Sequence, residues 1–388
     1  MKILYHHRTR SKDGQYVHIE EMIGALRELG HEVIVVAPPS GDDESFGSDG
    51  GLVARLKRHL PQFFYELMEL AYSLLVYRRL SEAVKEHRPD CLYERYNLFL
   101  PAGVWIKKRY GLPMLLEINS PIFEERARYD GIALKALARW SQQYAWRNAD
   151  AVLPVTEVLA NIVASYGVER SRISVIHNGI NARHFEHVPD TREAKAALGL
   201  QNRLVLGFTG FVRDWHGLDK VVDMIAKDPP QSERHLLVIG DGPARQALEK
   251  QARDLNVAHR VSFTGVIGRD QVARHVAAFD IALQPAVVPY ASPLKLFEYL
   301  ALGKAIVGPA QPNIEEILED GRNAVLFDPN RPDGLPQAIG RLCEDGALRE
   351  RMAANAARVI GEKQLTWQAN AERVTALFSR LIPPMADA

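Results

Sequence analysis

Short apolar segments alternate with segments of helical periodicity along most of this chain, and that alternation constrains its fold more than any other feature. The first unit joins an apolar run at 2–7 to another at 31–38 through a helical segment at 16–30 that ends at Gly30. A strand–helix–strand unit of this kind predicts a parallel sheet with right-handed crossovers. Further strands are predicted at 90–93, 113–118, 151–155 and 173–176.

A second run of the same alternation begins at 203, after a polar connection at 178–200. The chain has 388 residues, which is too long for one ordinary core. Two doubly wound α/β domains are therefore predicted. Ligands of such sheets bind outside the carboxyl ends of the strands, so we expect the site in a cleft between the two domains.

Composition excludes several classes of protein. Lysine plus arginine and aspartate plus glutamate each number 48, so no global attraction to nucleic acid is expected. Cys91 and Cys343 are far apart in sequence and indicate no disulfide framework, which fits a reducing cytosol. We find no signal peptide, no apolar run of about 18 residues and no zinc-ligand spacing. A cytoplasmic enzyme without a metal site is expected.

Two strands of the second domain end in glycine-containing loops that lead into helices. Gly210 follows the predicted strand 203–209, and Gly240 and Gly242 follow the next one. Glycine lets the backbone approach an anion closely, and the following helix N-terminus favours negative charge. Arg213 adds a guanidinium suited to phosphate oxygens. Each loop alone is also typical of a plain strand–helix turn, and the dinucleotide pattern GxGxxG is absent.

The segment SPLKLFEYLALGKAIVGP at 292–309 adds a third feature of this kind. Pro293 suits the first turn of a helix, whose free amides at 294–296 could face a diphosphate. Lys295 supplies a point charge, and Glu298 could accept hydrogen bonds from ribose hydroxyls. The alternative is an ordinary amphipathic helix with exposed charges.

Together these segments resemble the donor-binding domain of the GT-B glycosyltransferases of the family-4 type. The resemblance is carried by VIHNGIN with Phe185, GFTGFVRDWHGLD, VIGDGP, VSFTGVI, ALQPAVVPYASPLKLFEYLALGKAIV and GRNAVLFDP, in the family's order. The N-terminal half resembles the acceptor domain less closely, through Gly14, GHEVIVV and NADAVLPVTEVLANIV. The resemblance implies two Rossmann-like domains facing a central cleft. They are an acceptor-binding domain at 1–183 and a donor-binding domain at 184–365, with a last helix at about 366–388 that packs back on the first domain.

The resemblance also implies a reaction. A retaining, metal-independent hexosyltransferase would move a sugar from a UDP- or GDP-linked donor to a glycan or lipid-linked acceptor, in cell-surface polysaccharide or glycoconjugate biosynthesis. At matching positions it assigns the diphosphate to Arg213 and His216, with support from Lys295, and the ribose to Glu298. The other donor-binding residues that it implies are Gly14, Gly210, Gly240, Gly242, Val266, Tyr290, Ser292, Pro293 and Leu294.

The sequence departs from the family pattern at three places. His216 stands where a lysine usually precedes the glycine, and Tyr290 stands where the first of two glutamates is usual, which leaves the donor sugar open. Where many members have a histidine, this chain has Glu117 and Asn119. One of these orients the donor sugar or the acceptor hydroxyl, or else Glu117 only ends a strand and Asn119 caps a turn. His18 is interpreted as a core or capping histidine.

The implied mechanism is a front-face displacement. Arg213, Lys295 and helix dipoles stabilise the leaving diphosphate, and a donor phosphate oxygen takes the acceptor's proton, so no protein base is required. Glu117 and Asn119 complete the catalytic set that the resemblance implies. Two alternatives remain open: a non-catalytic nucleotide-sugar binder, and a nucleotide-sugar 2-epimerase, whose acid/base pattern the matched segments lack.

The segment 51–80 combines a basic cluster with aromatic residues, within a predicted helix at 52–87. Such a stretch can lie on an anionic membrane surface, which would place the protein at the inner face of the membrane and near a lipid-linked acceptor. In the alternative, which we favour for most of the aromatic residues, they pack inside the N-terminal domain. The basic cluster consists of Arg55, Lys57, Arg58 and His59.

Overall fold

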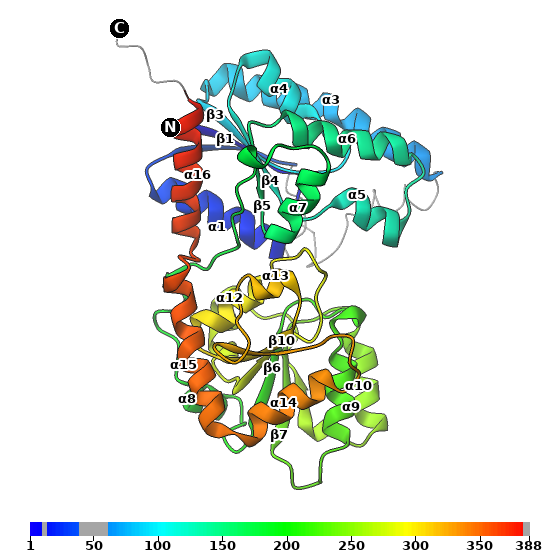
Figure 1. Cartoon of the computed structure of the whole chain (residues 1–388), viewed down its shortest axis with the longest axis vertical. Helices are drawn as coiled ribbons and strands as arrows, with labels where there is room; N and C mark the ends of the chain where they lie inside the picture. The colour runs from blue at the N-terminus through cyan, green and yellow to red at the C-terminus, as the bar shows by residue number, and fades with distance from the viewer. Residues whose placement is uncertain (10–13, 39–60, 383–388) are drawn as a thin grey trace. The chain divides into compact units, whose positions relative to one another are not determined.

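The computed structural model describes residues 1–9, 14–38 and 61–382, although the side chains of residues 14 and 15 are not described. The chain forms two compact units, and each contains one parallel sheet with helices (Figure 1). Unit 1 comprises Met1–His177 together with Trp367–Ala388, and unit 2 comprises Asn178–Thr366. The predicted division between 183 and 184 falls inside a short 3-10 helix, Ala182–Phe185.

The sheet of unit 1 has the strand order β2-β1-β3-β4-β5. Its strands are β1 (Lys2–His6), β2 (Glu32–Val36), β3 (Cys91–Arg95), β4 (Met114–Ile118) and β5 (Ala151–Pro154). The order reverses between β1 and β3, so this is the topological switch point of unit 1. The helices are α1 (Gly14–Glu28), α3 (Gln62–His87), α4 (Ala102–Tyr110), α5 (Ile122–Glu125), α6 (Lys135–Asn148), α7 (Glu157–Ser165) and α16 (Trp367–Leu381).

One predicted strand of unit 1 does not form. The segment 173–176 follows β5 through two hydrogen bonds, from Ser174 N–H to the Val152 carbonyl and from Ile176 N–H to the Pro154 carbonyl, both at 3.0 Å. It forms only an isolated bridge, at Ile173. Pro154 has no N–H to donate in return, so the ladder cannot continue there.

The C-terminal helix α16 completes unit 1 and packs along α1 (Figure 1). The rings of His18 and Trp367 lie 4.7 Å apart. His31 Nε2 lies 2.9 Å from Thr375 Oγ1. The side-chain amide of Asn370 donates to the carbonyl of His177 at 2.8 Å. This bond holds the start of α16 against the segment that follows 173–176.

The sheet of unit 2 has the strand order β11-β10-β9-β6-β7-β8. Its strands are β6 (Leu204–Thr209), β7 (Arg234–Ile239), β8 (Val261–Phe263), β9 (Ile281–Leu283), β10 (Ala305–Pro309) and β11 (Ala324–Phe327). Two clusters of buried apolar side chains form its core. The helices are α8 (Thr191–Ala197), α9 (Leu218–Ala226), α10 (Arg245–Asp254), α11 (Arg269–Val276), α12 (Leu294–Ala301), α13 (Pro312–Glu315), α14 (Gly334–Glu344) and α15 (Gly346–Glu362).

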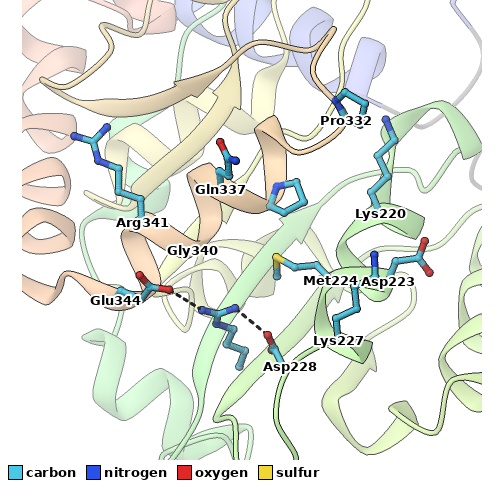
Figure 2. Close-up of a pocket in the computed structure, with 12 residues that line it drawn as sticks. Lys220, Asp223, Met224, Lys227, Asp228, Pro332, Gln337, Gly340, Arg341 and Glu344 are labelled. Atoms are coloured by element: carbon cyan, nitrogen blue, oxygen red, sulfur yellow. Dashed lines mark hydrogen bonds and ion pairs between the residues drawn. The ribbon is translucent and has the colours of Figure 1, made fainter.

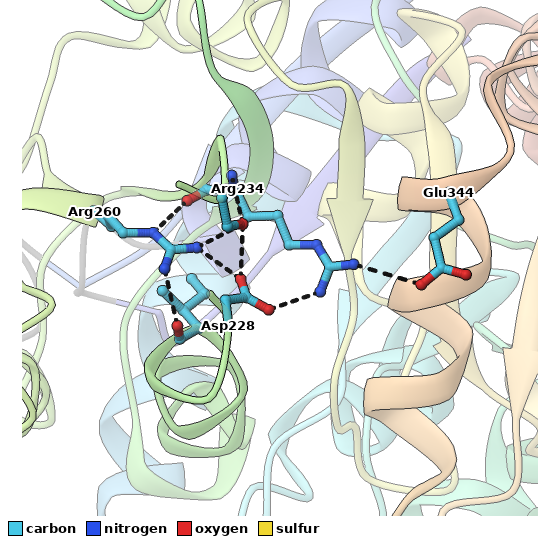
Figure 3. A network of polar contacts seen from close by, with 6 residues as sticks. Asp228, Arg234, Arg260 and Glu344 are labelled. Atoms are coloured by element: carbon cyan, nitrogen blue, oxygen red, sulfur yellow. Dashed lines mark hydrogen bonds and ion pairs between the residues drawn. The ribbon is translucent and has the colours of Figure 1, made fainter. Parts of the chain in front are cut away.

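A buried polar network ties the end of α9 to the start of β7 (Figure 3). Asp228 accepts hydrogen bonds from Arg260 at 2.6 Å and from Arg234 at 2.9 Å. Arg260 also donates to the carbonyl of Ile225 at 3.1 Å. Arg234 extends the network to Glu344 on α14, at 3.9 Å. Because both arginines are matched to acceptors inside unit 2, this cluster accounts for its own burial and needs no ligand.

Over residues 1–9, 14–38 and 61–382, no helix is long and apolar enough to cross a bilayer. Within the same ranges, no group of three or more His, Cys, Asp or Glu side chains could hold a metal ion.

Candidate functional site

The topology of unit 2 brings the donor residues expected after β6, β7, β8 and β9 to one edge of the sheet. Strands β9, β6, β7 and β8 are consecutive neighbours, and the predicted residues follow their carboxyl ends. After β6, the chain places β7 and β8 on one side of that strand. It then returns and places β9 on the other side of β6. This makes the β6–β9 boundary the topological switch point, where open α/β sheets bind ligands.

The two glycine loops after β6 and β7 pack directly on each other. Gly210 and Gly240 both have φ of +129°, which L side chains rarely adopt. A Cβ on Gly240 would lie 2.2 Å from the Gly210 carbonyl oxygen, and one on Gly242 would lie 2.3 Å from the Val212 carbonyl oxygen. Val212 N–H donates to the Asp241 carbonyl at 2.9 Å. Backbone packing therefore requires Gly240 and Gly242, whereas Gly210 is required by its positive φ.

Lys295 reaches the end of β6 from the first turn of α12. Its Nζ lies 3.8 Å from the centroid of the Phe208 ring, a cation–π contact. A Cβ on Gly210 would lie 3.3 Å from the same nitrogen. The Tyr299 hydroxyl accepts the Thr209 N–H at 3.0 Å and so fixes α12 against β6. Burial lowers the pKa of Lys295 to about 7, against the opposing effect of Glu298.

Glu298 lies one turn further along α12. Burial raises its pKa to about 7, while Lys295 and Arg269 act in the opposite direction. An amine and a carboxyl group, each held away from its ordinary pKa by loss of water, thus occupy the start of one helix. Strongly perturbed pairs of this kind are typical of functional sites.

His216 ends a 3-10 turn, Asp214–His216, between β6 and α9. The Arg213 N–H points to His216 Nδ1 at 3.1 Å, so Nδ1 is the acceptor and the ring proton lies on Nε2. Burial, Lys295 and Arg213 lower the pKa of His216 to about 3. It is therefore a neutral hydrogen-bond donor, whereas the lysine usual in the family is a cation. The exposed Arg213 guanidinium lies over the Phe211 ring.

Three side-chain amides hold the loop between β9 and α12. Asn178 donates to the Ser292 carbonyl at 2.6 Å, and Gln284 donates to the Ala286 carbonyl at 2.5 Å. Asn313 donates to the Ala291 carbonyl at 2.7 Å. These bonds fix the loop that carries the predicted residues Tyr290, Ser292 and Pro293, so that it enters α12 in one conformation.

The first turn of α12 offers two backbone donors. Leu296 N–H bonds to the Pro293 carbonyl at 3.1 Å, so it is not available to a diphosphate as predicted. Within the described part of the chain, the N–H groups of Leu294 and Lys295 have no partner. Val266 is exposed on the loop after β8, which a bridge between Gly240 and Gly265 joins to the second glycine loop.

In unit 1, Glu117 is the centre of a buried polar cluster. Glu117 is 2% exposed. Oε1 accepts from Arg95 and from Asn119, both at 2.5 Å. Oε2 accepts from the Tyr93 hydroxyl at 2.6 Å and lies 3.1 Å from His18 Nε2. Burial raises the pKa of Glu117, but His18 and Arg95 outweigh it and hold this pKa well below the ordinary range.

Neither sequence interpretation of Glu117 included these contacts, and both interpretations stay predictions. Both of its carboxylate oxygens accept hydrogen bonds at the carboxyl end of β4, one from Arg95 and Asn119 and the other from Tyr93. His18 is buried, as its interpretation as a core histidine required. Sequence reasoning missed Arg95. Arg95 could have been found from its place at the end of β3, because the register of the adjacent strands β3 and β4 pairs it with Glu117. Gly14 is the first residue of α1, two residues before the predicted helix start.

A groove of about 710 Å³ lies elsewhere in unit 2, between α9 and α14 (Figure 2). Lys220, Lys227 and Arg341 line it together with Asp223 and Glu344. The charges are mixed, and its described lining includes none of the residues predicted to bind a donor. The groove therefore carries no functional assignment.

Comparison with known families identifies the chain. The model described as "Glycosyltransferase Family 4" matches residues 12–184, and the model described as "Glycosyl transferases group 1" matches residues 190–359. The Anabaena protein HepE, solved with UDP, has a TM-score of 0.77 and 19% identity, with 98% of this chain and 100% of that chain covered. The chain belongs to the GT-B glycosyltransferases of the family-4, group 1 type, and it is a glycosyltransferase.

Curated relatives agree with this assignment at lower coverage. A D-inositol 3-phosphate glycosyltransferase of a Nocardioides species is 25% identical over 335 residues, which are 80% of this chain and 72% of that protein. An uncharacterised glycosyltransferase of Methanocaldococcus jannaschii is 24% identical over 239 residues. The latter match covers 61% of this chain and 60% of the relative, less than two thirds of its length. HepE has also been solved with UDP-glucose, at a TM-score of 0.75.

Proposed function

We propose that the protein is a retaining glycosyltransferase that moves a sugar from a UDP- or GDP-linked donor to a glycan or lipid-linked acceptor in cell-surface glycan or glycoconjugate synthesis. One observation carries the donor side: Lys295 and Glu298 lie together on the first turns of α12, at the switch point of unit 2. The UDP and UDP-glucose complexes of HepE support a uridine donor.

The chemistry follows from the charges at this edge. As the sugar–phosphate bond breaks, negative charge grows on the leaving diphosphate. The Lys295 ammonium, the Arg213 guanidinium and the His216 Nε2–H are groups that stabilise such charge in a partly desolvated site. The free N–H groups at the start of α12 add the helix dipole. Because these groups supply the positive charge, we propose that no metal is required.

Glu298 has a different task in this proposal. A carboxylate only accepts hydrogen bonds, so it suits the two hydroxyl donors of a ribose. A phosphate oxygen of the donor takes the acceptor's proton, and Glu117 acts only by orienting its neighbours in unit 1.

We propose peripheral membrane contact through 51–80, and α3 supplies the support. Its first turns bury polar residues, Glu66, Glu69 and Ser73. They expose apolar ones, with Phe64 at 50% and Leu74 at 66%. The expectation that these aromatic residues pack inside the domain is wrong for Phe63 and Phe64. The basic cluster at 55–59 lies outside the described residues.

Vesicle flotation checks this contact. With vesicles that contain an anionic lipid, the wild type should float, and a variant with Phe64→Ser and Leu74→Ser should float at least several-fold less. The control is the single change Leu255→Ser, at an exposed apolar site of unit 2. Equal flotation of all three proteins would contradict the contact.

A panel of UDP- and GDP-sugars tests the donor assignment. One of them should raise the melting temperature, and slow hydrolysis should release the nucleotide. NMR of the released or transferred sugar should show an anomeric configuration that is retained in the transfer product. Conversion of the sugar to its 2-epimer would indicate the isomerase alternative. Binding without any turnover would indicate a non-catalytic scaffold.

A further inference from the structure

Two buried side-chain amides hold the loop between β9 and α12 by its carbonyl groups. Gln284 is 1% exposed and Asn313 is 2% exposed. Gln284 donates to the Ala286 carbonyl at 2.5 Å. Asn313 donates to two carbonyls, those of Val288 at 3.2 Å and of Ala291 at 2.7 Å. Within the part of the chain that the structure describes, these bonds are all the hydrogen bonds of the two side chains.

The oxygen atom of each amide is buried and has no hydrogen-bond partner among the described residues. A buried polar atom without a partner destabilises a fold, and an apolar side chain of similar shape would avoid that penalty. Packing alone therefore does not account for an amide at either position. What each amide adds is the N–H donor that faces the loop.

The anchored carbonyls decide which way the N–H groups of the loop point. No peptide bond in this loop is cis, and in a trans peptide the carbonyl and the following N–H point in opposite directions. Val287 follows the carbonyl that Gln284 holds, so its N–H points away from that amide. Ser292 follows the carbonyl that Asn313 holds at 2.7 Å, so its N–H also points away from the amide that anchors it.

Both of these N–H groups are free. Within the described part of the chain, neither the Val287 N–H nor the Ser292 N–H has a hydrogen-bond partner. The other anchored carbonyls, of Val288 and Ser292, precede prolines, which have no N–H. The loop therefore adds two backbone donors to the free N–H groups at the start of α12. Groups of backbone N–H donors in turns and loops are suited to bind anions.

We propose that Gln284 and Asn313 are positioning residues of the donor site. They hold the carbonyls of the loop between β9 and α12, and so direct the N–H groups of Val287 and Ser292 to the donor's diphosphate. The inference rests on the proposed function and deepens it, because it adds backbone donors to the cations already assigned to the diphosphate. Neither amide touches the diphosphate itself. A loop that is fixed before the donor binds loses less conformational freedom on binding.

Titration of the full chain with UDP tests the proposal, and uridine is the comparison ligand that lacks the diphosphate. We expect Gln284→Met and Asn313→Ala each to weaken UDP binding about tenfold, because a misdirected N–H no longer donates to a charged oxygen. Uridine binding, followed by ligand-observed NMR, should not change. Gln311→Met is the matched control. Gln311 also has a buried oxygen without a partner among the described residues, but its side chain makes no hydrogen bond to the loop.

The direction of one N–H group can be tested by NMR of protein labelled with [15N]valine. The Val287 resonance is identified by its loss in Val287→Ala. It should shift on addition of UDP in the wild type and in Gln311→Met, because an N–H that donates to phosphate changes its chemical environment. In Gln284→Met the shift should be absent, although this protein should still bind uridine.

Wild-type affinity for UDP in both amide variants, or no shift of the Val287 resonance in the wild type, would overturn the inference and leave the donor assignment in place. A parallel loss of UDP and uridine binding would also overturn it, since the amides would then only maintain the fold. If one variant does not fold, the other decides, because the two amides hold different carbonyls. If GDP binds in place of UDP, GDP and guanosine are the ligands. If the wild type binds neither nucleotide, the proposed function fails, and this inference fails with it.

Discussion

Replacing Glu298 by alanine should weaken the binding of the donor nucleotide sugar by roughly 10²- to 10⁴-fold. Hydrogen bonds to a charged group contribute about 1.5–3 kcal/mol each, and a ribose offers two hydroxyls. The loss of the carboxylate also removes the influence that keeps the Lys295 pKa from falling further. Calorimetric titration with the donor found in the panel measures the change.

The fold should survive this substitution. Because burial raises the pKa of Glu298 from 4.5 to about 7, the folded protein binds its proton more tightly than the unfolded chain. At pH 8 the ionised carboxylate therefore destabilises the fold, and Glu298→Ala should melt no lower than the wild type. Glu315→Ala, at an exposed site on α13, is the control and should bind donor normally. Unchanged donor affinity in Glu298→Ala would remove the ribose assignment.

The kcat/KM for the donor should follow a bell-shaped pH profile centred near pH 7. The diphosphate requires the ammonium form of Lys295, which is lost as the pH rises through its lowered pKa of about 7. The ribose requires the carboxylate form of Glu298, which is lost as the pH falls through its raised pKa of about 7. Each limb should approach a tenfold loss per pH unit. Initial rates with a UDP-sugar from pH 5.5 to about 9 measure this, because a diphosphate esterified at both ends does not titrate there.

Two conservative variants separate the limbs. Lys295→Arg keeps its charge throughout, so the alkaline limb should disappear. Glu298→Gln cannot ionise, so the acid limb should disappear. Below pH 7, Lys295→Ala should lower kcat/KM by about 10²- to 10³-fold, the loss expected for one stabilising charge on a leaving group. The difference from the wild type should shrink as the pH rises, because the wild type loses the same charge through its lowered pKa of about 7. A profile that keeps both limbs in both variants would show that other groups set the pH dependence.

Local sequence patterns could predict most of unit 2. Helical spacing alone places Lys295 and Glu298 on one side of α12, and the order of apolar segments predicts a parallel sheet. The glycines at 210, 240 and 242 were predicted for their freedom to approach an anion. The structure adds a second reason, since a side chain at Gly240 or Gly242 would clash with the backbone of the first loop, and one at Gly210 would crowd Lys295.

The rest depended on contacts between distant segments. The hydrogen bond from Arg213 N–H that fixes the His216 tautomer depends on the turn geometry. The Glu117 cluster depends on strand register, which pairs residues about twenty positions apart. On α3, a hydrophobic pattern predicts a buried face, but Glu66 is buried because it accepts the N–H groups of Ala133 and Leu134 at the start of α6. No local pattern indicates that α3 buries polar side chains and exposes apolar ones.

Hydrogen–deuterium exchange of the full chain, with and without saturating UDP, tests the central claim most directly, because it locates the nucleotide on the sequence. We predict slower exchange on UDP binding in peptides that cover 210–217 and 290–298. Peptides from α9 and α14 around the groove should be unchanged. Protection confined to those two helices, or none at a UDP concentration that saturates binding, would contradict the assignment of the donor site to the edge formed by β6, β9 and α12.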